Sequence, residues 1–520
     1  MKHFDIVIAG GSIGGVLAAY SACQMNKRVL LVEETKWIGG QFTSQAVPPD
    51  EHPFIETFGC TASYRKFRQD VRRFMKEEFP AKAHIHDVAY WNPGHASVSR
   101  LSAPPKVFLH LFEKMLLPFI TNERLTLLTE HKVIDAKVLD DLIEYVTVEN
   151  TKSGIRFQAS ASYVLDATDT GELLPITHTE YVYGAEGYLK TKEPHTLEKP
   201  DPNDMQPITW VLAMDYQEGE DHRIPKPALY DFFKAQIWPC DTTPVLSWFG
   251  PDSSTGKTKE FGMFDGRGKG LFPLWSYRRV IDPKDFEPGF FKGDVTLLNW
   301  PQNDYIFGNI FESDDDETHK EHARELTLSY FYWLQNEAPR EDGQKGYPGL
   351  RLRGDILGTE DGLAMAPYIR ESRRIIAEKT ITEHKMNAEL IDHLPIEEDS
   401  VGVGSYHIDL HMTTVNHRFF FFKTWPFEIP LSAMIPKRMK NLIPACKNIG
   451  TTQLTNGCFR LHPVEWNIGE VAGYLASCAI DWKMTPKEIL YDDQALTRFQ
   501  KVLDDAGIER HWPKDQVHVI

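Results

Sequence analysis

The first apolar run of the chain, FDIVIAGGSIGG at residues 4–15, predicts a buried strand that passes through a glycine-rich turn into a helix. A second apolar run, VLLV at residues 29–32, predicts another strand, which ends on Glu33. Glu33 lies 18 residues after Gly15. A strand, turn, helix and strand in this order, with an acid at this spacing, are typical of a dinucleotide-binding unit.

The turn departs from the usual G-x-G-x-x-G pattern at one position. Gly10 and Gly15 match the first and third glycines, whereas Ser12 stands at the second. Glycines let the backbone approach a diphosphate, and N–H groups at the helix N-terminus bind it. Serine is small, and its hydroxyl can also reach a phosphate. The other two glycines, Gly11 and Gly14, keep the turn open. The alternative is a tight strand-to-helix turn that binds nothing.

The order of strands and helices indicates how the chain is divided. Helices are predicted over residues 64–77, 104–120 and 367–375, and further strands near 125–128, 132–138, 143–149 and 163–166. From about residue 176 to 400 this order is lost and Pro, Trp and Tyr are frequent. One helix there starts at the acidic residues 314–317 and carries an apolar stripe, which predicts core: Leu326, Tyr330, Trp333 and Leu334. Residues 441–480 return to strand, loop and helix.

We therefore expect an α/β fold in which a Rossmann-type domain is built from both chain ends, with an inserted α+β substrate lobe. The predicted division is 1–176 for the first part of the nucleotide-binding domain, 177–400 for the substrate lobe, 401–485 for the second part and 486–520 for a C-terminal tail.

The composition narrows the class of function. A chain of 520 residues exceeds one ordinary core, and 42% apolar with 25% charged residues indicates a soluble globular protein. The net charge of −17 argues against nucleic-acid binding, which needs a basic surface, and against anionic membranes. No apolar run approaches 18 residues and the first strand begins after three, so we expect a cytoplasmic protein without a membrane span. The six cysteines form no paired motif, so neither a metal site nor a redox dithiol is expected.

Four segments together resemble a known family. GGSIGG with VLLVEE resembles the start of the glutathione-reductase-type flavoproteins, which bind FAD. VLDATDTGELLPI at residues 164–176 is similar to the segment that closes their FAD domain, with Asp169 in place of the usual glycine. Residues 365–375 and 426–476 resemble one subset, the FAD-dependent oxidoreductases often labelled "xanthan lyase-like". The resemblance therefore implies an FAD-dependent oxidoreductase, while no residue pattern shows polysaccharide cleavage.

The resemblance implies a set of cofactor-binding residues. The turn would line the FAD diphosphate, Glu33 and Glu34 would lie at the adenosine ribose, and Val133 would meet the adenine through its backbone. Asn448 matches a loop at the flavin edge. The remaining implied residues are Gly10, Gly11, Ser12, Ile13, Gly14 and Gly15 of the turn, Gly39, Gly40 and Gln41 near the phosphates and flavin, and Ala167, Thr168 and Asp169 near the ribityl–phosphate region.

The last helix carries a further implied role. Gly469 and Glu470 would open it, so that its N-terminus faces the pyrimidine end of the flavin. The positive end of the helix dipole would then stabilise negative charge on reduced flavin.

The default flavin reaction is hydride transfer between a substrate carbon and N5. Oxidation of an alcohol also needs a base, for which histidine is suited near neutral pH. His462 is a candidate because it precedes the helix that should face the flavin, and His411 and His407 lie in GSYHIDLH, a segment similar to one in the same subset. Each could instead be a structural histidine. Arg460 is a candidate substrate contact.

We expect the substrate to be a small polar molecule, with a sugar or another hydroxylated compound as the first choice. No second nucleotide unit is found, so electrons would pass to oxygen, a quinone or a carrier protein, and the chain could form homo-oligomers. Three alternatives stay open: a flavin monooxygenase, a reductase or desaturase of a C=C bond, and a non-catalytic flavin-binding protein.

Overall fold

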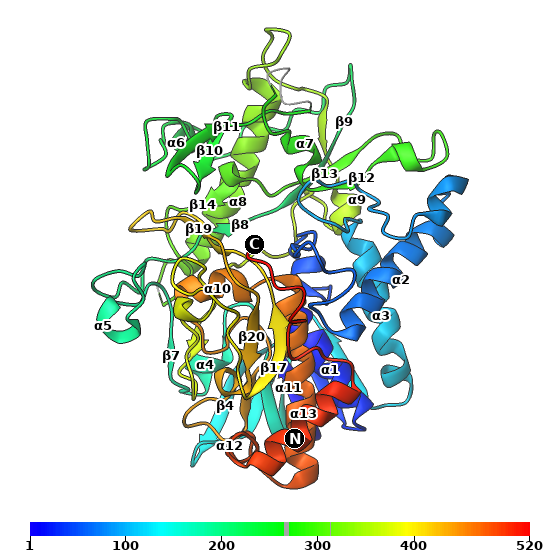
Figure 1. Ribbon diagram of the computed structural model, residues 1–520. Coiled ribbons are helices and arrows are strands. Elements are labelled where there is room, and N and C mark those ends of the chain that lie inside the picture. Colours follow the sequence, from blue (N-terminus) through cyan, green and yellow to red (C-terminus); the bar gives the residue numbers. More distant parts are fainter. Residues whose placement is uncertain (265–269, 313) are drawn as a thin grey trace.

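The computed structural model describes residues 1–264, 270–312 and 314–520. Figure 1 shows a lower domain, which contains the N-terminal segments (blue) and the C-terminal segments (orange to red), and an upper lobe formed by the middle of the chain. This arrangement agrees with the predicted α/β fold with an insert.

A parallel sheet forms the centre of the lower domain. Its strands lie in the order β3–β2–β1–β6–β21. Their bounds are β1 (Lys2–Ala9), β2 (Val29–Glu33), β3 (Leu125–Thr129), β6 (Arg156–Asp166) and β21 (Leu442–Pro444). The antiparallel strands β4 (His131–Leu139) and β5 (Leu142–Asn150) extend the sheet from the first half of β6. The strands predicted from the apolar runs are confirmed.

Glycines let two helices pack closely against each other below the turn. α1 (Ile13–Gln24) lies beside α11 (His462–Trp482), and a Cβ on Gly469 would fall 2.2 Å from the carbonyl oxygen of Gly14. On Gly14 itself, a Cβ would fall 1.7 Å from the Ala445 oxygen, just past the end of β21. The two chain ends are therefore joined in one core.

Longer helices cover this core. They are α2 (Ala62–Glu78), α3 (Pro105–Thr121), α12 (Pro486–Tyr491) and α13 (Asp493–Asp505). The segment predicted as a C-terminal tail thus carries two helices. Beyond them Trp512 is buried, and the last residue, Ile520, exchanges two backbone hydrogen bonds with Thr424.

The upper lobe has its own sheet and aromatic core. The sheet order is β12–β13–β9–β15, with bounds β9 (Leu212–Tyr216), β12 (Arg279–Ile281), β13 (Val295–Leu298) and β15 (Leu350–Leu352). The helix α8 (Asp316–Asn336) buries the predicted apolar stripe of Leu326, Tyr330, Trp333 and Leu334. The lobe boundaries at residues 177 and 400 stay predictions.

Short strands also pair outside these two sheets: β7 (Tyr181–Val182) with β16 (Arg374–Ile375), β8 (Ile208–Thr209) with β14 (Asp304–Tyr305), β10 (Phe249–Asp252) with β11 (Lys257–Glu260), β17 (Ser400–Gly404) with β20 (Phe427–Pro430), and β18 (Ile408–Leu410) with β19 (Phe420–Phe422). Short helices are α4 (Leu173–Ile176), α5 (Tyr188–Thr191), α6 (Tyr230–Lys234), α7 (Leu274–Tyr277), α9 (Gly354–Leu357) and α10 (Gln453–Phe459).

Two predictions about helices are wrong. Residues 367–375 were expected to be helical, but they run as an extended segment in which Tyr368 pairs with the backbone of Thr209. The last long helix does not open at Gly469 and Glu470, because α11 already begins at His462, with Pro463 in its first turn. Gly469 and Glu470 therefore lie two turns inside α11.

Candidate functional site

The turn after β1 has the backbone shape that a diphosphate cradle needs. Gly10 has a φ of +93°, and a Cβ there would fall 2.4 Å from the Ala167 oxygen, so only glycine fits. Ser12 caps α1, with its hydroxyl oxygen accepting a hydrogen bond from the Gly15 N–H at 3.3 Å. At the position where the usual pattern has glycine, Ser12 therefore stabilises the start of α1.

Four N–H groups of the turn already have protein acceptors. Gly10 donates to the Val32 carbonyl at 2.9 Å, Gly11 to Glu33 at 2.7 Å, Gly14 to Glu465 at 3.2 Å, and Gly15 to Ser12. Among the described residues none accepts from the N–H of Ser12, which lines the cavity described below. That N–H is therefore a free donor for an anion.

A cavity of about 800 Å³ runs along the carboxyl edge of the parallel sheet and continues against the upper lobe. Its wall includes Trp210 and much of the segment 364–369 from the lobe. Predicted cofactor residues on the wall are Gly10, Ser12, Glu33, Glu34, Gly40, Val133, Ala167, Thr168 and Asp169. Together they place the adenosine, diphosphate and ribityl predictions in one continuous space.

The acid at the end of β2 is buried and held in place. One Glu33 oxygen accepts from the Gly11 N–H, and the other accepts from the N–H and hydroxyl of Thr35 at 2.8 and 2.6 Å. Burial raises the pKa of Glu33 above its usual value, although these hydrogen bonds oppose the shift. Glu33 is one of the residues that line the cavity, and its contact with the ribose stays a prediction.

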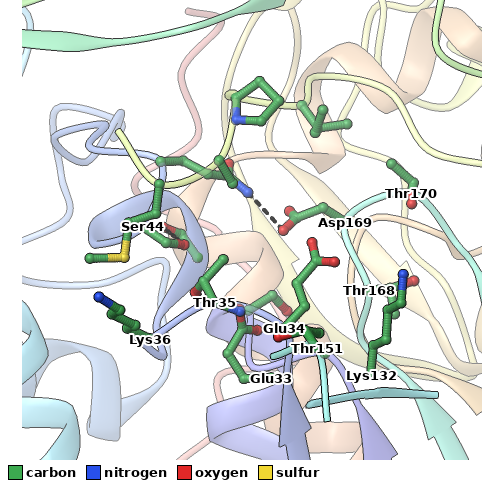
Figure 2. Close-up of a pocket in the computed structure, with 18 of the residues that line it drawn as sticks. Glu33, Glu34, Thr35, Lys36, Ser44, Lys132, Thr151, Thr168, Asp169 and Thr170 are labelled. Carbon is green, nitrogen blue, oxygen red and sulfur yellow. Dashed lines mark hydrogen bonds between the residues drawn. The ribbon is translucent and has the colours of Figure 1, made fainter. Parts of the chain in front are cut away.

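The next residue points into the cavity. Figure 2 shows the Glu34 carboxylate rising from the end of β2 toward Asp169, with Lys132 and Thr168 beside it. Surrounding protein, followed by the negative charges of Glu172 and Glu33, raises the pKa of Glu34.

Other predicted cofactor residues lie behind the wall and shape it. Gly39, which precedes Gly40 of the wall, has a φ of +106° and packs on the ring of Phe112. Gln41 is fully buried and donates to Glu465 at 2.5 Å and to the Arg460 carbonyl at 3.0 Å. The rest of the turn that is absent from the wall is Gly11, Ile13, Gly14 and Gly15.

The three predicted residues from the C-terminal part are also behind the wall. Asn448 donates to the Asp166 carbonyl at 3.1 Å, which fixes the loop after β21. Gly469 packs on Gly14, and Glu470 accepts from the Ser63 hydroxyl at 2.7 Å. Their implied roles at the flavin stay predictions.

Sequence reasoning missed a buried ion pair at this site. Lys447, fully buried, pairs with Asp169, whose other oxygen accepts from Gln45 at 2.7 Å. Burial lowers the pKa of Lys447, but the carboxylate of Asp169 and its neighbours outweigh this and raise it. Lys447 directly precedes Asn448, which was predicted to lie at the flavin edge. This neighbouring position was the signal in the sequence that could have identified Lys447 as a site residue.

His462 is placed differently from its predicted role. Its Nδ1 accepts from the Asp50 N–H at 3.3 Å, and its Nε2 lies 3.1 Å from the Val47 carbonyl oxygen. The ring is fully buried, and burial lowers the pKa of His462 to about 4. With both nitrogens engaged, the imidazole has no position left for a substrate proton. The geometry therefore argues for a structural histidine.

His411 and Arg460 are brought together although 49 positions separate them. His411 Nε2 lies 3.4 Å from Asp409 Oδ2, and Arg460 reaches the same oxygen at 3.1 Å. His411 Nδ1 lies 2.6 Å from Asp304, which Arg370 binds at 2.9 Å. We call this group the Asp409 cluster, and it comprises Asp304, Tyr368, Arg370, Asp409, His411 and Arg460.

The Asp409 cluster lies next to the cavity wall. Ala366 donates to the Ser44 carbonyl at 3.1 Å, and both residues line the cavity. Two positions further on, Tyr368 accepts from Arg460 at 2.5 Å through its hydroxyl. The segment 364–370 thus runs directly from the wall into the cluster.

His407 lies on the loop that leads into β18. Its ring packs on Phe421 with 4.1 Å between centroids, and burial lowers the pKa of the imidazole. Its Nδ1 is buried without a hydrogen-bond partner in the described part of the chain. No ion pair places it in the Asp409 cluster.

The residues present fit FAD. The cavity lies within the range of small-molecule sites, and a close-packed glycine turn, a buried acid and a strand backbone follow one another along it. The amide oxygen of Gln45, a residue of the cavity wall, is buried without a partner among the described residues. This unpaired atom suits a polar cofactor edge.

In the three described ranges no helix is long and apolar enough to cross a membrane. Within those same ranges no group of three or more His, Cys, Asp or Glu side chains is placed to hold a metal ion.

Comparisons with solved structures find weak likenesses. The myxobacterial chondrochloren halogenase CndH is 17% identical, with a TM-score of 0.22, over 43% of this chain and 46% of that one. A variant of E. coli quinol fumarate reductase FrdA is 13% identical, with a TM-score of 0.34, over 97% and 74%. OxyS, the anhydrotetracycline hydroxylase of Streptomyces rimosus, is 10% identical, with a TM-score of 0.33, over 97% and 67%. The chain spans less than half the length of the halogenase.

No curated protein matches the chain. The model of the FAD dependent oxidoreductase family matches residues 5–503, which include the turn, the cavity wall and the Asp409 cluster. The chain therefore belongs to the FAD-dependent oxidoreductase family and is an enzyme that binds FAD.

Proposed function

We propose that the enzyme transfers a hydride between a small polar, hydroxylated substrate and N5 of FAD. The observation that carries this proposal is the pairing of His411 with Asp304 beside Arg460, next to the cofactor cavity. We also infer, from the four segments quoted above, that the chain falls in the glutathione-reductase-type, "xanthan lyase-like" subset.

The first step is to orient the base. A carboxylate accepts hydrogen bonds but does not donate them, so the 2.6 Å contact with Asp304 places the His411 proton on Nδ1. Burial would raise the pKa of Asp304, but Arg370 and His411 outweigh it and hold the pKa below its usual value. Asp304 therefore stays ionised and fixes the ring.

The remaining ring nitrogen can then receive the substrate proton. Nε2 faces Asp409 at 3.4 Å, longer than an ordinary hydrogen bond, so a substrate hydroxyl could compete for this position. The side chain of His411 is 28% exposed, whereas that of Arg460 is 3% exposed. His411 thus combines a fixed orientation with access.

Arg460 would hold the substrate oxygen. Its guanidinium binds Asp409 and Tyr368, and its Nε is buried without a partner among the described residues. Burial raises the pKa of Asp409, but its contacts with His411 and Arg460 outweigh this effect and lower the pKa. A polar substrate that entered here would find both a donor and a base.

The cofactor residues set the direction of approach. Glu33 and Val133 would hold the adenosine, the turn would hold the diphosphate, and Trp210 with Ala366 would flank the flavin end. When bound, FAD supplies the hydride acceptor. Tyr368 follows Ala366 by two positions, so the Asp409 cluster would face the flavin end.

The test is anaerobic mixing of the holoenzyme with sugars, polyols, hydroxy acids and unsaturated acids, followed by loss of the visible flavin band. We expect a hydroxylated compound to reduce the flavin, and His411→Gln to slow this by roughly 100-fold to 10,000-fold. The exposed His393 provides the matched control, since His393→Gln should have no effect.

Other outcomes would contradict the proposal. An unchanged rate of flavin reduction in His411→Gln would show that His411 is not the base. Oxidation of reduced flavin by an unsaturated acid, without reaction of any alcohol, would favour a C=C reductase. Oxygen incorporation into product would favour a monooxygenase.

A further inference from the structure

The wall of the cofactor cavity is unusually acidic for a site that takes a diphosphate. Its carboxylic residues are Glu33, Glu34, Glu130, Asp169, Glu172, Glu360 and Asp361, and its basic residues are Lys36, Lys132, Lys152, Lys320 and Arg324. FAD brings about two further negative charges in its diphosphate. Because like charges in a confined site repel, the basic groups that face the diphosphate decide the affinity.

Most of the basic residues are remote or already paired. Arg324 forms an ion pair with Asp361, and the nearest carboxylate to Lys152 is that of Glu130 at 3.9 Å. Lys36 and Lys132 are exposed, and Lys132 lies beside Glu34 (Figure 2). Lys320 differs from them, because its partner can be replaced.

Lys320 reaches the cavity from α8 of the upper lobe. Its ammonium is 2.7 Å from Glu317, whose side chain is 86% exposed, so that pair is solvated and weak. Burial lowers the pKa of Lys320, but Glu317 outweighs it, and Glu172 and Glu34 raise the pKa further. Lys320 therefore lies within the field of the acids that end β2 and follow β6.

Lys320 lines the same cavity as Gly10 and Ser12 of the turn, where the diphosphate is expected. The ends of β1, β2 and β6 meet at one edge of the sheet, where the Gly10 turn begins α1. A bound diphosphate would be a stronger and less solvated partner for an ammonium than the exposed Glu317 carboxylate.

We propose that Lys320 leaves Glu317 and binds the FAD diphosphate, so that α8 of the inserted lobe closes over the cofactor. This inference rests on FAD binding and is independent of the hydride-transfer proposal. The upper lobe would then contribute directly to cofactor affinity as well as to the substrate side.

The test compares FAD release from the holoenzyme on dilution, followed by flavin fluorescence, in Lys320→Gln, Lys320→Arg and Lys257→Gln. Lys257 is exposed on β11 of the same lobe and is absent from the cavity wall, so it is the matched control. We expect Lys320→Gln to raise the Kd for FAD roughly tenfold, Lys320→Arg to retain most affinity, and Lys257→Gln to have no effect.

Two competitors separate a phosphate contact from a general change of shape. ADP should lose affinity in Lys320→Gln by the same factor as FAD, whereas adenosine, which has no phosphate, should bind as it does to the wild type. High salt should reduce the difference between wild type and Lys320→Gln. Unchanged FAD affinity, or an equal loss for adenosine, would overturn the proposal, whatever the substrate proves to be.

Discussion

Gly14→Ala tests how tightly the turn is packed against the C-terminal part of the chain, at the loop after β21. The new Cβ would lie 1.7 Å from the Ala445 oxygen, whereas ordinary contact begins at 3.4 Å, so the backbones must separate by about 1.7 Å (3.4 − 1.7). Such overpacking costs about 1–3 kcal/mol. The loss of chain entropy in the unfolded state offsets about 0.4–1 kcal/mol of this. The substitution should therefore destabilise the protein and displace the free N–H of Ser12.

The assay is urea unfolding followed by far-UV circular dichroism, with FAD affinity measured in parallel. Gly469→Ala, on the opposite helix, should have a similar effect, since its Cβ would fall 2.2 Å from the Gly14 oxygen. Gly293→Ala is the control, because its Cβ would meet only the Tyr216 oxygen at 3.9 Å. If Gly14→Ala unfolds at the same urea concentration as the control and binds FAD equally well, the close-packing argument is refuted.

Three further predictions concern buried groups. Burial raises the pKa of Glu470 to about 7 from 4.5, so the folded protein holds a proton that the unfolded chain releases. The free energy of unfolding therefore falls as pH rises from about 4.5 to about 7. Glu470→Gln should reduce the difference in stability that urea unfolding measures between pH 5 and pH 8. Lys447→Met leaves the Asp169 carboxylate without its ammonium partner and should lower the free energy of unfolding by about 3 kcal/mol. This is the low end for a buried pair, because 23% of the Asp169 side chain is exposed. An unchanged thermal unfolding temperature would contradict this prediction. His462→Gln should leave the pH profile of flavin reduction unchanged, because both ring nitrogens already have partners, and loss of one ionisation would show that the histidine is the base.

The parallel sheet and the turn were predictable because their signals are local. Apolar runs bounded by glycine marked the strands, and the acidic start with an apolar stripe marked α8. The segment 367–375 was not predictable in this way. Arg370 and Arg374 are four residues apart, which is a helical spacing. In the structure they instead form ion pairs with Asp304 and Glu186, which lie far away in the sequence.

The candidate catalytic residues show the same limit. Asp304, Tyr368, His411 and Arg460 come from separate segments, and no spacing in the sequence links them. The position of His462 depends on the loop through Asp50, which folds back onto the start of α11. Sequence alone could therefore name the histidines but could not choose among them.

The most direct test of the account is a crystal structure of the enzyme with FAD bound. The account predicts the adenosine at Glu33 and Val133, the diphosphate at the Gly10 turn, and the flavin beside Trp210 and Ala366 with N5 toward the Asp409 cluster. A flavin whose N5 faces away from His411 and Arg460, or FAD bound outside this cavity, would contradict it.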